Sequence, residues 1–157
     1  MPESSINEAL CRQLVSMDAA GIHVPNRALV LGYGALGRAV SADLRRRWCQ
    51  VAVHDLSEEH RTLAEVDGYP VYRGLHIAMG RGPCVILCCT DEPVLGREDY
   101  DHIPDGAILV NASSTNPDLP DPRLSLFHAK NRNGLFHMLN GGLLLDLFDG
   151  SIDLRAA

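Results

Sequence analysis

Short, continuously apolar runs alternate with amphipathic stretches along most of the chain. Positions 28–31, 84–89 and 106–111 are apolar nearly throughout, which is typical of strands covered on both faces of a sheet. Between positions 36 and 44, apolar residues instead recur at helical spacing and would share one helix face. The alternation predicts an α/β fold in which a mainly parallel sheet carries helices on both faces.

Caps and chain breakers indicate the remaining elements. Helices are predicted over residues 4–20, 57–66, 74–80 and 95–102, and further strands over 50–55 and 69–72. Beyond Pro117 the alternation ends. Asn-Gly turn signals then separate three predicted short strands, at 124–130, 135–139 and 143–148, with at least one antiparallel pair.

The length of 157 residues suits a single domain with a sizeable core. We expect residues 1–24 to form a leading helix and linker, 25–122 the core, and 123–157 the C-terminal strands and tail. No apolar stretch approaches the length of a membrane span, and the start Met1-Pro2-Glu3 lacks the basic region of a signal peptide. A cytoplasmic location is therefore expected.

A glycine-rich loop, GYGALG at positions 32–37, lies between the first predicted strand and its helix. In a dinucleotide-binding loop, Gly32 would allow a sharp turn and Gly34 the close approach of a pyrophosphate. Gly37 would let the helix lie close to the strand, with the helix N-terminus directed at the phosphates. This order predicts a Rossmann-like, doubly wound fold that binds a nucleotide. The alternative is such a fold with a decayed site or another adenosyl ligand.

Asp55 closes the second predicted strand, about 20 residues beyond the loop, where such folds carry the carboxylate that accepts from the adenosine ribose hydroxyls. A carboxylate there would repel a 2′-phosphate, which favours NAD over NADP as the cofactor. Three arginines at 45–47 lie in the last turn of the predicted helix, at the opposite end from the loop. Cations suit the helix dipole there, so we expect them to be structural.

Several segments have sequence motifs that are similar to those of one enzyme family. The loop has the pattern GYGxxG, which is more specific than GxGxxG, residues 105–108 are DGAI, and residues 142–147 are GLLLDL. With the leading helix, these segments resemble the NAD-binding domain of S-adenosylhomocysteine hydrolase over nearly the whole chain. The resemblance implies that Thr90 lines the cofactor and that Asn111 ends the fifth strand beside it.

Departures from this family bear on activity. Residues 113–115 replace the family's histidine after the fifth strand, Asp91 replaces a glycine, and Asp146 replaces the asparagine that holds the nicotinamide amide. Asp146 can accept a hydrogen bond but cannot donate one unless it is protonated. The family's substrate domain has no counterpart in this sequence. The resemblance therefore implies a stand-alone cofactor domain without the hydrolase activity.

The candidate cofactor-binding residues lie in the glycine loop or near the carboxyl ends of predicted strands. They are Gly32, Tyr33, Gly34, Ala35, Leu36, Gly37, Asp55, Leu56, Cys89, Thr90, Asp91, Asn111, Ala112, Ser113 and Asp146. No catalytic residue is identified, because each of the seven histidines fits a surface or core role.

Composition excludes several function classes. A net charge of −6 argues against a nucleic-acid surface, and the chain offers only Lys130 for imine chemistry. The five cysteines form no CxxC pair and suit a reducing compartment, and the sequence shows no metal-ligand spacing.

Three functions remain open from the sequence. The first is a small NAD-dependent oxidoreductase acting on a small molecule, as a homodimer or with a partner protein that completes the site. The second is a non-catalytic NAD-binding module or an accessory subunit of a biosynthetic enzyme, and the third is a structural domain that binds no dinucleotide. A single domain of this kind usually supplies only half of an active site, so self-association or a partner is expected.

Overall fold

One eight-stranded sheet organises the described part of the chain. The structure, a computed structural model, describes residues 17, 21–47, 50–90, 95–111, 126–139 and 155–156. The strands are β1 (Arg27–Leu31), β2 (Gln50–His54), β3 (Val71–Tyr72), β4 (Val85–Cys88), β5 (Ile108–Asn111), β6 (Leu126–Asn131), β7 (Gly134–Leu139) and β8 (Arg155–Ala156). Their spatial order is β3-β2-β1-β4-β5-β7-β6-β8.

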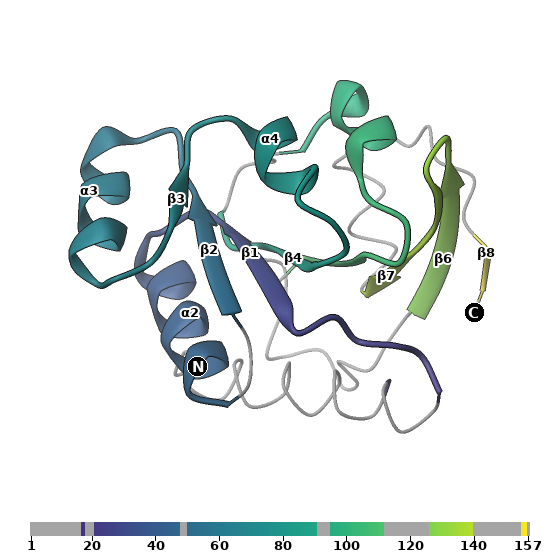
Figure 1. Cartoon of the computed structure of the whole chain (residues 1–157), viewed down its shortest axis with the longest axis horizontal. Coiled ribbons are helices and arrows are strands. Elements are labelled where there is room, and N and C mark those ends of the chain that lie inside the picture. Colours follow the sequence, from purple (N-terminus) through teal and green to yellow (C-terminus); the bar gives the residue numbers. More distant parts are fainter. Residues whose placement is uncertain are drawn as a thin grey trace.

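All neighbouring strands from β3 to β7 run parallel, and β6 is antiparallel to both β7 and β8 (Figure 1). The order reverses beside β1, where β2 and β3 extend the sheet to one side and β4 and β5 to the other. This arrangement confirms the predicted Rossmann-like α/β fold with a C-terminal hairpin extension.

The described connections contain the helices α2 (Ala35–Arg47), α3 (Glu58–Val66) and α4 (Leu75–Met79) and the 3₁₀ helix η1 (Arg97–His102). As the capping pattern predicts, the hydroxyl of Ser57 accepts the amide of His60 at the start of α3. The helix predicted at 95–102 is the 3₁₀ segment η1, which begins two residues later than expected.

Side chains of the central strands alternate between two apolar clusters on opposite faces of the sheet. Val30 and Leu87 pack on one face with residues of α2 and α3, while Leu29 and Ile86 pack on the other with residues of α4. In Figure 1, α2 and α3 lie at the end that carries β3, and β6 and β8 lie at the opposite end. Every residue of β4 is buried, as its unbroken apolar run predicts.

The β6–β7 hairpin turns one residue earlier than the Asn-Gly signal indicates. Asn131 pairs with Gly134, so the two loop residues are Arg132 and Asn133. Gly134 starts β7 with φ of 137°, and a Cβ there would stand 2.2 Å from Oδ1 of Asp105. Both this left-handed φ and the close approach of Asp105 favour glycine at the position.

Some predicted elements lie outside the described residues. These include the strand at 143–148 and the helix at 4–20, apart from Met17, which is helical and buried. The division into 1–24, 25–122 and 123–157 stays a prediction. Within the described residues, no helix has both the length and the apolar character that crossing a membrane requires.

Candidate functional site

Gly32 begins the loop after β1 and is held by its neighbours on two sides. Its amide donates a 2.9 Å hydrogen bond to the carbonyl of His54, which continues the pairing of β1 with β2. Its φ is +100°, and a Cβ would stand 2.2 Å from Cγ2 of Thr90. Both the left-handed backbone and the contact with Thr90 require glycine at this position.

Gly37 and Gly34 have opposite surroundings. A Cβ on Gly37, in the first turn of α2, would stand 1.7 Å from the carbonyl oxygen of Gly32. Only glycine allows α2 to begin this close to the loop, as the sequence predicts. A Cβ on Gly34 would meet no atom of the described residues within 4 Å, so the loop is open at the N-terminus of α2.

The carboxylate of Asp55 lies against this loop. Its Oδ2 accepts the backbone amide of Tyr33 at 2.7 Å, and its Oδ1 accepts the amide of Ser57 at 2.8 Å. Burial alone would raise the pKa of Asp55, but these two amides and His60 outweigh that effect and hold the pKa below its usual value. The side chain is 12% exposed and carries a negative charge at neutral pH.

Two residues of α3 that the sequence reasoning missed also contact this acid or its backbone. His60 Nδ1 lies 2.9 Å from Asp55 Oδ2. Arg61 Nη1 donates to the carbonyls of Asp55 at 2.9 Å and Leu56 at 2.8 Å. The capping pattern at Ser57 fixes where α3 begins, and this signal could have indicated that its first turn faces Asp55.

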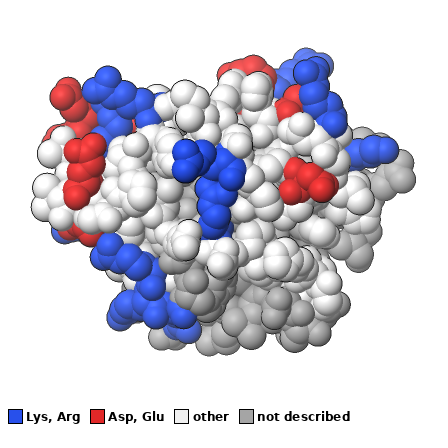
Figure 2. All heavy atoms as spheres, viewed as in Figure 1, with Lys and Arg blue, Asp and Glu red and all other residues white. Residues whose placement is uncertain are grey.

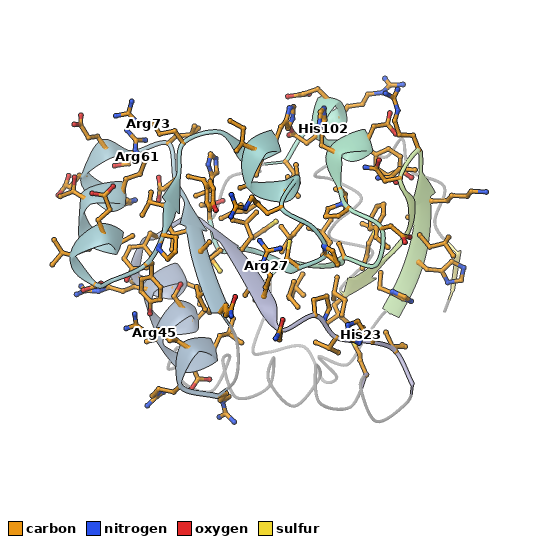
Figure 3. All side chains as sticks on the ribbon, viewed as in Figure 1. His23, Arg27, Arg45, Arg61, Arg73 and His102 are labelled. Atoms are coloured by element: carbon orange, nitrogen blue, oxygen red, sulfur yellow. The ribbon has the colours of Figure 1, made fainter. Side chains whose placement is uncertain are left out.

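Leu56 is 78% exposed although it is a large apolar residue. It follows Asp55 directly, at the carboxyl end of β2, and Arg61 holds its carbonyl. Figure 3 shows Arg61 and Arg73 at this same end of the molecule, beside α3 and β3. An exposed apolar side chain beside a half-buried carboxylate can pack against a flat organic group.

The side chain of Tyr33 turns away from the open side of the loop. It is 1% exposed, and its hydroxyl donates a 2.6 Å hydrogen bond to Asp67, which also receives Arg38 Nε at 3.2 Å. Burial, followed by the hydrogen bond to Asp67, raises the pKa of Tyr33. Any contact of Tyr33 with a ligand in the loop would therefore involve its backbone.

The other candidate residues lie near the carboxyl ends of β4 and β5, at the start of α2 or outside the described residues. The Cys89 amide donates to the carbonyl of Leu31, and Thr90 follows beside Gly32. Asn111, the last residue of β5, pairs with Cys88. Ala35 and Leu36 open α2. The remaining candidates, Asp91, Ala112, Ser113 and Asp146, fall outside the described residues.

The arginines at 45–47 have structural partners, as predicted. Arg46 and Arg47 pair with Asp43 at 2.8 and 3.2 Å, and Arg45 lies 4.1 Å from the ring centroid of Tyr69. Arg45 also donates to the carbonyl of Asp67. These contacts tie the end of α2 to the segment after α3.

Several histidines also make contacts within the fold. His54 is buried, with Nδ1 2.9 Å from the carbonyl of Tyr72. His76 stacks on His102 at 3.6 Å between ring centroids, and its Nε2 lies 2.6 Å from Asp99. No group of side chains within the described ranges could hold a metal ion.

Solved structures share this fold at low sequence identity. A dipicolinate synthase component from Bacillus halodurans matches with a TM-score of 0.56 and 14% identity, over 71% of this chain and 40% of its own. The corresponding dipicolinate synthase component from Bacillus subtilis matches with 0.51 and 12%, over 68% and 38%. A D-3-phosphoglycerate dehydrogenase-type oxidoreductase from Ralstonia solanacearum matches with 0.54 and 16%, over 69% and 41%.

This chain therefore spans about two fifths of the length of these proteins. No protein-family description and no curated protein matches the sequence. At these identities the likeness shows the fold alone, and it agrees with the strand order and the glycine loop: the chain has the Rossmann-like α/β fold.

Proposed function

We propose that this chain binds NAD(H) and works as a small NAD-dependent oxidoreductase, with a second copy or a partner protein completing the site. The observation that carries the proposal is the convergence of three features. The backbone is open at Gly34, the N-terminus of α2 faces the same space, and the carboxylate of Asp55 contacts the loop through the amide of Tyr33. Together they match the needs of a pyrophosphate and an adenosine ribose.

The ribose would be bound at Asp55. Its Oδ2 already accepts the amide of Tyr33 and lies 2.9 Å from His60 Nδ1, while among the described residues Oδ1 accepts from Ser57 alone and keeps a lone pair for a ribose hydroxyl. The exposed side chain of Leu56 would then pack against the adenine. The charge that Asp55 carries at neutral pH supports NAD over NADP, because it would repel a 2′-phosphate.

The nicotinamide half would lie near the carboxyl ends of β4 and β5. The resemblance to the cofactor domain of S-adenosylhomocysteine hydrolase supports Thr90 and Asn111 there. Asp146 would stand in place of the family's asparagine, and we place Asp91, Ala112 and Ser113 beside them although Asp91 and Ser113 depart from the family's residues. Bound NAD would supply the hydride chemistry. The chain's own residues would hold the cofactor, and a second copy or partner would bring the substrate and the proton-transferring group.

A second candidate is a non-catalytic NAD-binding subunit of a biosynthetic enzyme. It is favoured by the likeness to the Bacillus halodurans dipicolinate synthase component, which is named as one subunit of that enzyme. In either case the buried free cysteines in and beside β4 support a reducing, cytoplasmic location.

Calorimetric titration with NAD, NADH and NADP tests the proposal. We expect NAD and NADH to bind at least tenfold more tightly than NADP, and Gly34→Ala to abolish that binding without unfolding the chain. No binding of any of the three would overturn the proposal. NADH turnover with carbonyl or imine substrates then separates the oxidoreductase from the non-catalytic alternative.

A further inference from the structure

A pocket of about 180 Å³ lies beside α4, mainly toward the ends of β1 and β2 opposite the glycine loop, although its Tyr72 lies level with the carboxyl end of β2. Its lining includes Arg27 and Gln50, the first residues of β1 and β2, and Cys84, which directly precedes β4. The glycine loop follows the other end of β1, about 13 Å away at 3.3 Å per residue. The pocket is therefore separate from the candidate nucleotide site.

The charge in this pocket is of one sign. Arg27 and Arg81 line it, and no acidic residue does. Arg27 Nη1 donates to the carbonyl of Arg81 at 2.6 Å, which fixes the first guanidinium beside the backbone of the second. Within the described ranges, neither arginine has a carboxylate within 4.0 Å. Both keep donors for an external anion.

The surface view shows this isolation directly. In Figure 2 a group of basic atoms stands near the centre of the face, bordered mainly by uncharged atoms, and Figure 3 labels Arg27 at that place. The Arg81 guanidinium carbon lies 6.0 Å from the ring centroid of Tyr72, which also lines the pocket. The positive charges of Arg27 and Arg81, on an otherwise uncharged surface, would attract an anionic group.

Apart from the two arginines, Gln50 and Cys84, the lining is apolar. Leu29, Ala52, Pro70 and Ala78 form it together with the ring of Tyr72. A dry cavity of about 150 Å³ suffices to bind benzene in a well-studied protein, so this volume accommodates a ring-sized group. The pocket thus combines an apolar wall with the amide of Gln50 and two guanidinium groups, each of which matches a carboxylate through two parallel hydrogen bonds.

We propose that this pocket binds a small organic monocarboxylate whose apolar body packs against Tyr72 and Leu29 while its carboxylate receives Arg27 and Arg81. The site is independent of the proposed NAD site, because it uses the opposite ends of β1 and β2. A ligand bound here would be an effector or a second ligand and would not be the substrate of the hydride transfer.

Calorimetry with benzoate as the probe tests this proposal. We expect saturable binding at one site, with benzamide, the uncharged analogue, and inorganic phosphate, which has no apolar body, each binding at least tenfold more weakly. Benzamide binding as tightly as benzoate would overturn the role of the arginines. Phosphate binding as tightly would overturn the role of the apolar wall.

Variants locate the site. Arg81→Gln should weaken benzoate binding at least tenfold, and this residue is exposed, so its replacement leaves the fold intact. Arg27→Gln should have the same effect and keeps a donor for the Arg81 carbonyl. Arg132→Gln, which removes an exposed arginine on the distant hairpin, should change nothing. Equal affinity in all three variants would overturn the proposal.

A competition experiment separates this proposal from the function proposed above. Saturating NADH should leave benzoate binding unchanged, and Gly34→Ala should also leave it unchanged. Loss of NAD binding with intact benzoate binding would count against the nucleotide site alone. Displacement of benzoate by NADH would overturn the separate pocket.

Discussion

The hydroxyl of Tyr33 donates a 2.6 Å hydrogen bond to the carboxylate of Asp67, and this bond joins the glycine loop to the segment that follows α3. Arg38, on the first turns of α2, contacts the same carboxylate. The loop is thus held from behind by its own tyrosine while its open side stays free at Gly34. A preorganised loop loses less conformational entropy when it binds a ligand.

Removing the hydroxyl of Tyr33 tests whether its hydrogen bond to Asp67 stabilises the fold. We expect Tyr33→Phe to lower the free energy of unfolding by about 1 kcal/mol, because the ring stays packed and one hydrogen bond is lost. Urea denaturation measures the change. Tyr69→Phe is the matched control, since the structure gives its hydroxyl no hydrogen-bond partner among the described residues, and it should have a smaller effect. Equal losses in the two variants would contradict the role of the Tyr33–Asp67 bond.

Replacement by alanine should affect the stability of the fold strongly at Gly37 and weakly at Gly34. Gly37→Ala should lower the free energy of unfolding by about 3 kcal/mol, because its Cβ would collide with the carbonyl of Gly32. Gly34→Ala should change it by less than about 0.5 kcal/mol, since its Cβ meets open space. Thermal unfolding of both variants checks the pair. Similar melting temperatures would show that α2 does not approach the loop as closely as described.

The same Gly34→Ala variant should lose NAD binding while it stays folded, because the new methyl group would fill the space for the pyrophosphate. Asp55→Ala should weaken NAD binding about tenfold, since it removes charge-assisted hydrogen bonds to the ribose. Calorimetry measures both effects. Asp101→Asn, which changes an acid beside Arg132 of the distant β6–β7 hairpin, is the control and should leave NAD affinity within about twofold. Unchanged affinity in Asp55→Ala would refute the adenosine site.

The stability of the fold should depend on Asp55 in acid. The pKa of Asp55 is held below its unfolded value, so its contribution is complete above roughly pH 4 and is lost as the pH falls through the folded pKa. Urea denaturation between pH 7 and pH 3 should show wild-type stability falling faster than that of Asp55→Asn. If the stability of the two proteins fell equally with pH, the ionised carboxylate of Asp55 would not stabilise the folded state.

The buried thiols should be unreactive in the native protein. Burial raises the pKa of Cys84 to about 11 and that of Cys88 to about 12, and the pKa of Cys89 shifts in the same direction. At pH 8 these thiols stay protonated, so alkylation mapped by mass spectrometry should modify them only after denaturation. Modification of Cys88 in the folded protein at the rate of a free thiol would show that β4 opens.

Sequence reasoning predicted the parts of the fold that depend on local pattern. The runs of β1 and β4 and the cap of α3 at Ser57 depend on residues within one element, and each forms as expected. The roles of Gly32 and Gly37 were also predictable, because the strand, loop and helix that surround them are consecutive in the sequence.

Contacts between distant segments could not be predicted. The Asn-Gly pair predicts a turn at residues 133–134, but Gly134 instead starts β7, where its positive φ and the side chain of Asp105 favour glycine. Likewise Asp67 determines where the ring of Tyr33 points, and no periodicity marks that pairing. The specific likeness to S-adenosylhomocysteine hydrolase stays a prediction, and so do the roles of Asp91, Ala112, Ser113 and Asp146.

The alternation of β4 between two apolar clusters has a consequence for how such a chain tolerates insertions and deletions. All four of its side chains are apolar and buried, so sliding the strand by one residue would place no charge in either cluster. A slip in either β4 or β1 would, however, separate Gly32 from Thr90, which lies just beyond β4. A one-residue insertion or deletion in either strand should therefore disturb the glycine loop without placing a charge in the core.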